Sequence, residues 1–157
     1  MKNEFGGEMK RFLLIVILLS LVMNTIGCSL NGAYSSEEAI KRGDVVYQVE
    51  VANLERFEQF LTNLSRKEED TVRVTGYTDE GDPIFQDLHF DGNVIHYTYD
   101  NSNDEFAGKD KGKEKDICKQ IINRENEQDE VEFLISDCSK GKARFLLRVE
   151  KSKLMHN

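Results

Sequence analysis

An apolar segment near the start of the chain decides which residues are available to fold. It runs for twelve residues from Phe12 to Met23, directly after the basic pair Lys10-Arg11. A helix that crosses about 30 Å of hydrocarbon needs about 20 apolar residues, whereas the apolar part of a secretory signal peptide needs about 7–15. We therefore expect residues 1–27 to be a lipoprotein signal peptide, with translation starting at Met9 because the acidic residues before it are unusual in such a segment.

The segment ends at Thr25-Ile26-Gly27-Cys28, where small residues before a cysteine resemble the lipobox of bacterial lipoproteins. In that motif the cysteine is diacylated and becomes the N-terminus after cleavage. Thr25 departs from the aliphatic residue that usually stands there. Ordinary cleavage that leaves a free thiol at Cys28, or an uncleaved anchor, are the alternatives. We expect Cys28 to be lipidated and to hold the protein at the outer face of the cell membrane.

The remainder of the chain has the length of one domain. We predict a tether over residues 28–34 and a single extracytoplasmic α+β domain over residues 35–157. The whole chain has 21 Lys and Arg residues against 29 Asp and Glu, which gives a net charge of −8. This acidic excess argues against nucleic acid as a partner, because phosphates bind to patches of Lys and Arg.

Capping residues and hydrophobic spacing predict two helices. The shorter helix starts at Ser35, with Glu38 completing a capping box. Ala39 and Ile40 supply its buried side. The main amphipathic helix follows Asn53, whose side chain can cap it. Its apolar face consists of Leu54, Phe57, Phe60, Leu61 and Leu64.

Alternation of apolar and polar residues predicts seven strands. They are Val45–Val51, Thr71–Tyr77, Ile84–Phe90, Asn93–Tyr99, Ile117–Ile122, Val131–Asp137 and Ala143–Val149. Residues 100–116 carry ten charged side chains and are predicted to be a mobile surface loop. The expected fold is α+β: an antiparallel β-sheet of about six to seven strands, packed by the main amphipathic helix plus the short N-terminal helix.

The dipeptide Asp91-Gly92 between two alternating segments is a strong hairpin signal, because both central residues of a type I′ turn need positive φ. A two-residue loop there would pair Asp87 with His96. The same register places the apolar residues on one face of the hairpin, and places Asp87, His89 and His96 on the other.

Asp87, His89 and His96 form the sharpest candidate site. Two imidazoles and a carboxylate can bind Zn²⁺ or act as acid and base. The alternative is an ordinary polar face, since the exposed side of an antiparallel sheet holds polar residues in any case. We favour the ordinary face and keep metal binding as the weaker hypothesis.

Cys118 and Cys138 remain as a pair once Cys28 carries lipid. If the strands around them form a hairpin in which Cys118 faces Cys138, then Gln120 faces Ser136. We predict a structural disulfide, as is usual outside the cell. A redox-active pair or metal thiolates are the alternatives, although the sequence has no CxxC motif.

Other patterns assign no chemistry. Residues 100–104 alternate oxygen-bearing side chains as calcium loops do, but Glu105 and Lys111 stand where an EF-hand has Gly and Glu. GxSxG, HExxH and P-loop motifs are missing from the sequence, so we assign no catalytic residue and no cofactor and do not expect an enzyme. Residues 140–157 include six basic residues and one acidic residue, which form either a solvated strand face or a contact for anionic lipid or a partner.

Several short segments between residues 36 and 140 have the order and spacing of a known family. They are Glu38-Ala39-Ile40, Gly43-Asp44-Val45-Val46, Asn53-Leu54-Glu55-Arg56-Phe57, Tyr77-Thr78, Glu80-Gly81-Asp82-Pro83-Ile84, Tyr97-Thr98-Tyr99-Asp100-Asn101, Asp110-Lys111-Gly112 and the two cysteines. On these residues the chain resembles a small family of lipoproteins from Bacillus-type Gram-positive bacteria, domain of unknown function family 4362. The resemblance implies a secreted, lipid-anchored α+β domain, and it carries over no catalytic or ligand-binding residue.

These patterns lead us to expect non-enzymatic binding or structural work at the cell envelope, with an unknown envelope protein or a small ligand as partner. The alternative is a metal- or small-ligand-binding lipoprotein associated with a transporter. About 130 residues are few for the two lobes of a typical solute-binding protein. An envelope hydrolase, a third class, would need a nucleophile and a base that the sequence does not bring together.

Overall fold

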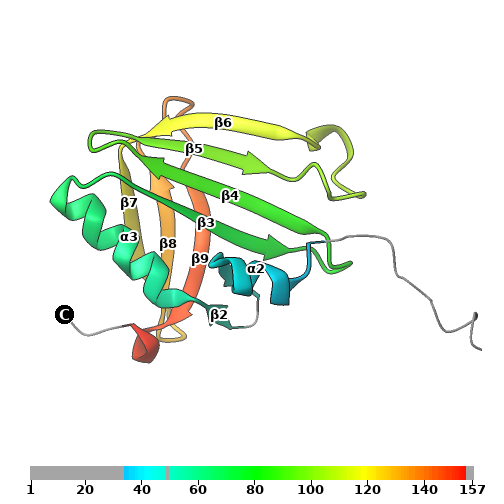
Figure 1. Ribbon diagram of the computed structural model, residues 1–157, viewed down its shortest axis with the longest axis horizontal. Coiled ribbons are helices and arrows are strands. Elements are labelled where there is room, and N and C mark those ends of the chain that lie inside the picture. The colour runs from blue at the N-terminus through cyan, green and yellow to red at the C-terminus, as the bar shows by residue number, and fades with distance from the viewer. Residues whose placement is uncertain (1–33, 49, 155–157) are drawn as a thin grey trace, which may run out of the picture. The chain divides into compact units, whose positions relative to one another are not determined.

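The computed structural model describes residues 34–48 and 50–154. The described residues form one compact unit, and Cys28 with the expected signal peptide lies outside them. The described part is an α+β domain, as the sequence predicts (Figure 1). In it, no helix combines the length and the apolar character needed to span a membrane.

The elements follow one another as two helices among short strands, and then as a run of strands. The first half contains α2 (Ser36–Arg42), β1 (Val45–Tyr47), β2 (Val51–Ala52), α3 (Leu54–Arg66), β3 (Asp70–Tyr77) and β4 (Pro83–Phe90). The second half contains β5 (Ile95–Asp100), η2 (Gly108–Asp110), β6 (Lys113–Cys118), β7 (Gln120–Glu125), β8 (Glu130–Ser136), β9 (Arg144–Glu150) and η3 (Lys151–Lys153).

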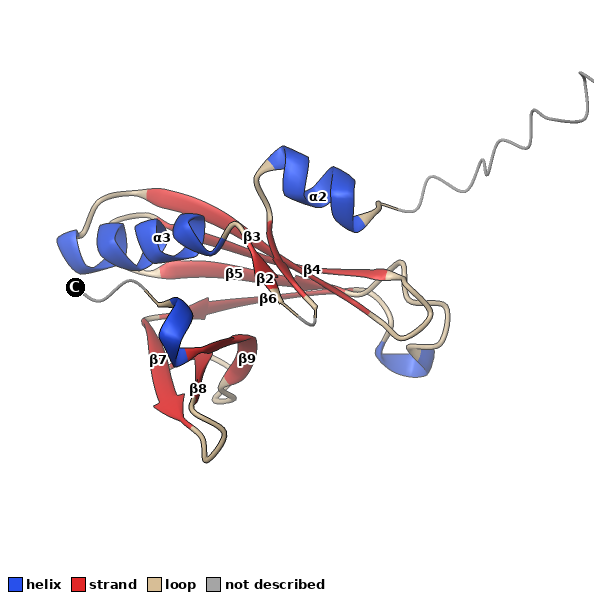
Figure 2. Ribbon diagram, turned by 90° about the horizontal axis from the view of Figure 1, so that it is seen from below, coloured by secondary structure: helices blue, strands red, loops and turns tan. Residues whose placement is uncertain are grey.

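The strands of the described residues form two sheets rather than the single sheet expected. The large sheet has six strands in the order β2-β1-β3-β4-β5-β6, and the small sheet has three in the order β7-β8-β9. Neighbouring strands are antiparallel except β1 and β3, which are parallel because the chain returns through α3 between them. The small sheet lies on one side of the large sheet and α2 lies on the other (Figure 2).

α3 and the small sheet share one hydrophobic core with the inner face of the large sheet. Phe57 and Phe60 of α3 are fully buried, as their spacing predicts. The ring of Phe57 meets that of Phe133 in β8 edge to face, with centroids 5.1 Å apart. Leu88 and Ile95 belong to the same core. Each of these buried side chains contributes about 1.5–3 kcal/mol relative to an exposed one.

α2 begins as predicted, because Ser35 Oγ accepts a hydrogen bond from the backbone N–H of Glu38 at 3.2 Å. Gly43, with a φ of 90°, ends the helix. Ala39 is buried, but Ile40 is 40% exposed, so the prediction for Ile40 is wrong. Successive residues of a helix point about 100° apart, and this helix of two turns buries only the row that contains Ala39.

Asp44 fixes the connection from α2 to β1. Its carboxylate accepts hydrogen bonds from Tyr34 Oη at 2.8 Å and from Thr75 Oγ1 at 2.7 Å. The hydroxyl of Tyr77 donates to the carbonyl of Tyr34 at 3.0 Å. Burial, with the nearby Tyr34 and Asp44, raises the pKa of Tyr77 to about 12. The first described residue of the chain is therefore held against β3.

Asn53 does not cap α3 with its side chain, contrary to the prediction. Its amide instead donates to the carbonyl of Ile40 at 3.0 Å and to that of Asp44 at 2.8 Å. Carbonyl groups at the end of a helix lack partners within the helix, and the Asn53 amide bonds to one such carbonyl, that of Ile40 in the last turn of α2. Asn53 therefore joins the two helices.

Two of the predicted strands are each divided by a corner. The segment Val45–Val51 consists of the antiparallel strands β1 and β2, joined by a turn in which Gln48 donates to Glu50. The segment Ile117–Ile122 is divided at Lys119, where the chain passes from the large sheet to the small one. In the first segment apolar residues alternate through the corner, so periodicity does not reveal it, and in the second segment apolar residues stand on both sides of Lys119 and Gln120.

The charged segment 100–116 is a loop only in part. β5 extends to Asp100, and residues 113–116 belong to β6, which pairs with β5. Lys113 and Lys115 are exposed on this edge strand, where charged side chains discourage pairing with another chain. The loop is therefore limited to residues 101–112.

The connection between β4 and β5 has four residues, 91–94, rather than two. Asp91 Oδ1 accepts hydrogen bonds at 2.9 Å from the backbone N–H groups two and three residues further on, which favours this wider turn. The register is shifted by two residues, so His89 faces His96 and the predicted pairing of Asp87 with His96 is wrong. Because the shift is even, every side chain stays on its predicted face.

Cys118 and Cys138 form the predicted disulfide at the corner between the sheets. Cys118 is the last residue of β6, and Cys138 follows β8, so the bond ties the large sheet to the small one. The predicted register of this second hairpin is confirmed, since Gln120 faces Ser136.

Replacing both Cys118 and Cys138 by Ala should lower the free energy of unfolding by about 3 kcal/mol, because a loop of about twenty residues is no longer closed in the unfolded chain. Urea denaturation followed by circular dichroism measures the change. The matched control is Cys28→Ala, which should leave the midpoint unchanged. A double variant as stable as the parent would contradict a clamp between the sheets.

Candidate functional site

A groove of about 680 Å³ lies where β9 meets the inner face of the large sheet. Both sheets contribute aromatic side chains to it: Tyr47 from β1, Tyr77 from β3, Tyr99 from β5 and Phe145 from β9. Sites for small molecules are concave, enclose about 300–1,000 Å³ and are lined mainly by apolar and aromatic groups. The groove has a volume in this range and a mainly apolar and aromatic lining.

Gln86 is the buried polar residue of the groove, and it is only 8% exposed. Its Nε2 donates to the carbonyl of Leu146 in β9 at 3.3 Å, and its Oε1 accepts from Tyr97 Oη in β5 at 2.7 Å. Both ends of the amide are satisfied within the domain. Gln86 therefore links the large sheet to the small one.

Positive charge lies beside the aromatic rings of the groove. The rings of Tyr47 and Phe145 contact each other with centroids 5.4 Å apart. The guanidinium of Arg144 lies 5.6 Å from the ring of Tyr99, and burial raises the pKa of that tyrosine. Asp79 is the one carboxylate among the lining residues. The groove is thus an aromatic surface with charges at its margin.

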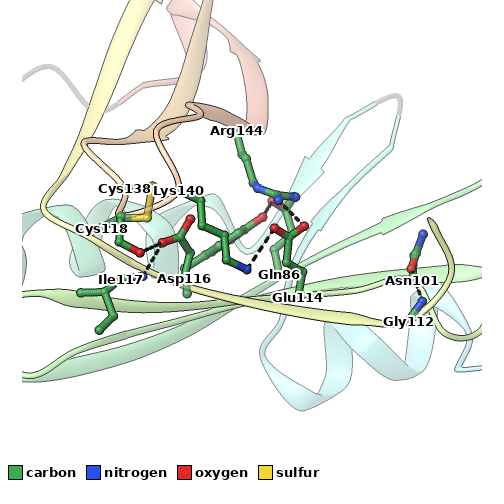
Figure 3. Close-up of polar contacts among 12 residues, drawn as sticks. Gln86, Asn101, Gly112, Glu114, Asp116, Ile117, Cys118, Cys138, Lys140 and Arg144 are labelled. Atoms are coloured by element: carbon green, nitrogen blue, oxygen red, sulfur yellow. Dashed lines mark hydrogen bonds and ion pairs between the residues drawn. A yellow bond between two sulfur atoms is a disulfide. The ribbon is translucent and has the colours of Figure 1, made fainter.

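Two carboxylates of β6 hold the segment between β8 and β9 in place (Figure 3). Glu114 accepts hydrogen bonds from Arg144 and, at 3.3 Å, from Lys140 Nζ, and these bonds lower the pKa of its carboxyl. Asp116 accepts from Ser139 Oγ at 2.6 Å, which lowers its pKa in the same way. The junction between the sheets is therefore charged around the disulfide.

Asp116, Cys118 and Cys138 have possible metal-ligand atoms within 4.8 Å of one another. The two sulfur atoms are joined to each other, so they are not thiolates and do not offer the ligands that a zinc site uses. In the oxidised protein this cluster is structural.

On the outer face of the large sheet, His89 and His96 lie side by side, with ring centroids 5.7 Å apart and 27° between the ring planes. Asp87 is not with them, since both of its oxygens bind an arginine of β3. The imidazoles instead have Glu69, 3.9 Å from His89 Nε2, and Asp91, 2.8 Å from His96 Nε2. Two of the three predicted ligands are brought together, and other carboxylates take the place of the third.

Three side chains in contact follow the order nucleophile, base and acid: Thr71, His89 and Glu69. Thr71 Oγ1 lies 2.9 Å from His89 Nδ1, on the side of the ring away from Glu69. A hydrolase also needs a pocket for its substrate and donors for an oxyanion. None of the three residues lines the groove described above. The arrangement does not define a hydrolytic site.

The segment 100–104, whose sequence resembles a calcium loop, makes contacts that close the surface loop at residues 101–112. Asp100 accepts hydrogen bonds from Ser102 and pairs with Lys113 Nζ at 3.0 Å. Asn101 Oδ1 accepts from the N–H of Gly112 at 2.8 Å. These oxygens bond to different partners and do not converge on one point.

The basic C-terminal segment is largely neutralised within the domain. Its ion pairs are Lys140 and Arg144 with Glu114, Arg148 with Glu130 and Glu132, Lys151 with Glu125, and Lys153 with Glu50 and Glu150. Little of its positive charge is left uncompensated for an external anion.

Sequence patterns do not identify the groove, although the sequence contains one signal of it. Gln86 falls in phase with Leu88 and Phe90 on the buried face of β4. A polar residue on such a face must find a partner, which marks the place as different from plain core. Its partner across the groove, Leu146, is sixty residues away, so local periodicity cannot identify it.

These observations define a class of protein: a small α+β domain with two sheets, a disulfide that joins them and an aromatic groove. The sequence profile of the family described as Domain of unknown function (DUF4362) matches residues 41–132, and the chain belongs to that family. The matched range includes α3 and the large sheet but ends before β9. No curated protein and no solved structure matches the chain.

The variant Glu114→Gln tests whether the charged contacts at the junction between the sheets stabilise the fold, and it does so through the pH dependence of stability. The pKa of Glu114 is lowered in the folded state, so its stabilisation is present above about pH 4.3 and is lost as the pH falls through the folded-state value. We expect the variant to melt a few degrees below the parent at pH 7, and the difference to disappear toward pH 3. Thermal melts at both values measure it. Glu127→Gln, at an exposed position, should melt like the parent at both.

Proposed function

We propose that this protein is a lipid-anchored, extracytoplasmic binding module of a Bacillus-type Gram-positive bacterium, and that it acts without catalysis at the cell envelope. Cys28 carries the lipid, and the membrane is its first partner. The groove between the sheets takes the second partner, which is a small ligand or a side chain of an envelope protein.

The sequence around Cys28 and the disulfide support this location independently. The apolar segment and the small residues before Cys28 resemble those of exported lipoproteins. A disulfide between Cys118 and Cys138 persists in an oxidising compartment and is rare in the cytosol. With Cys28 acylated, no cysteine of the chain is left as a free thiol.

The aromatic groove is the observation that carries the binding role. Its aromatic residues come from four strands of both sheets, and Gln86 fixes the distance between the two walls. A preformed groove lowers the cost of ordering side chains when a ligand binds. Aromatic side chains provide large apolar contact areas at little conformational cost, as in many recognition surfaces.

The size of the groove also favours the alternative class, a small-ligand-binding lipoprotein associated with a transporter. About 680 Å³ is enough for a drug-sized molecule. The described residues form one compact body rather than two lobes, so such a ligand would sit between sheets and not between domains.

Cys28→Ala tests the anchor. In a Gram-positive host, the parent should partition into detergent and carry the mass of a diacylglyceryl group, and the variant should do neither. The Cys118→Ala, Cys138→Ala double variant is the control and should keep the lipid. A parent protein without added mass, unchanged by the signal-peptidase inhibitor globomycin, would contradict the anchor.

Phe145→Ala tests the groove. The probe is 1-anilinonaphthalene-8-sulfonate, whose aromatic rings suit the aromatic walls of the groove. We expect its fluorescence titration to show at least tenfold weaker binding to the variant. The matched control is Phe106→Ala, which removes a phenyl ring that is 74% exposed and outside the groove. Equal losses in both variants would show that the probe does not report on the groove.

A further inference from the structure

The outer face of the large sheet carries a histidine pair that the groove does not use. His89 and His96 are directly opposed in the β4–β5 ladder, and their side chains are 44% and 48% exposed. Opposed residues of an antiparallel pair have Cβ atoms about 4.5–5.5 Å apart. Two exposed imidazoles at that spacing can turn toward the same ion.

Each ring has one nitrogen engaged and one nitrogen available. His89 Nδ1 is 2.9 Å from Thr71 Oγ1, and His96 Nε2 is 2.8 Å from Asp91 Oδ2. Histidines that bind metals usually donate their other N–H to a carboxylate or another oxygen, which fixes the tautomer and the ring orientation. With both N–H groups donated in this way, His89 Nε2 and His96 Nδ1 carry the lone pairs.

Glu69 supplies a carboxylate at a distance that fits an ion rather than a hydrogen bond. Its Oε1 is 3.9 Å from His89 Nε2, too far for a direct hydrogen bond. Bonds of about 2.0–2.1 Å from zinc to nitrogen and about 2.0–2.2 Å from zinc to oxygen, meeting at a tetrahedral angle, would place these two atoms about 3.4 Å apart, so a small shift of the Glu69 side chain is needed. Glu69 is 72% exposed, so its side chain is free to adjust.

The charges around the pair favour a divalent cation. Asp91 and Glu69 flank the two imidazoles, and Asp91 Oδ2 lies 2.8 Å from His96 Nε2. Asp87, in contrast, is held by Arg73 at 2.6 and 3.0 Å in the next row of the sheet.

We propose that His89, His96 and Glu69 form a zinc site, in which Thr71 and Asp91 orient the two imidazoles and water completes the tetrahedral shell. The ion would join the start of β3 to the β4–β5 hairpin. Imidazole nitrogen and carboxylate oxygen are ligands that Zn²⁺ shares with other transition metals but that Ca²⁺ does not select as a set. The site is independent of the lipid and of the groove.

Calorimetric titration with Zn²⁺ tests the site. The full chain is purified without a polyhistidine tag and with Cys28→Ala, which removes the only cysteine outside the disulfide. We expect one Zn²⁺ per chain and no heat with Ca²⁺. His89→Ala and His96→Ala should each weaken binding at least tenfold, and Glu69→Gln should weaken it several-fold.

Two matched controls separate this site from other sources of binding. Asp87→Asn keeps the face intact but alters the carboxylate that the sequence pattern first suggests, and His156→Ala removes the third histidine of the chain. Both should bind Zn²⁺ like the parent. Absence of binding by the parent, or an Asp87→Asn loss as large as that of His96→Ala, would overturn the proposal.

The unsubstituted histidines provide a second readout that does not depend on the folding of variants. Imidazole ¹⁵N spectra should show large shifts for His89 Nε2 and His96 Nδ1 on addition of Zn²⁺, while His156 stays unchanged. Shifts confined to His156, or a shift of only one of the paired rings, would also reject the site.

Discussion

A single disulfide holds the two sheets together at the corner where β6 gives way to β7. Cys118 ends the last strand of the large sheet, and Cys138 follows the middle strand of the small one. Glu114 and Asp116 hold the segment after Cys138 on β6, and further from the corner Gln86 bonds to Leu146. The aromatic walls of the groove stand at a fixed distance because these covalent and polar contacts act on the same pair of sheets.

Local sequence patterns predicted the helices and strands well, but they predicted poorly where strands break and how long the turns are. The spacing of Phe57 and Phe60 marks the buried face of α3, and the cysteine hairpin has its predicted register, because both depend on short-range periodicity. Apolar residues stand on both sides of the break at Lys119, so the local pattern does not reveal it. The Asp91 side chain selects a wider turn than Asp-Gly suggests. Asn53 serves α2 rather than α3, which only the tertiary structure decides.

The candidate sites show the same division between local and distant information. His89 and His96 are seven residues apart and share a predicted face, so the sequence placed them together even with the register in error. Asp87 was grouped with them by that register, and the arginine that binds it lies on another strand. The groove joins strands from both ends of the domain, and only Gln86 on a buried strand face hints at it.

The hydrogen bonds of Tyr34 have a mechanical consequence. Its hydroxyl is bound to Asp44 and its carbonyl to Tyr77, so the chain that arrives from the N-terminal side is fastened to the sheet before α2 begins. A tensile load applied through that chain would strain these two hydrogen bonds first and would reach α2 only after they part. The core around Phe57 and the two walls of the groove would be shielded from the movements of whatever holds the N-terminal end.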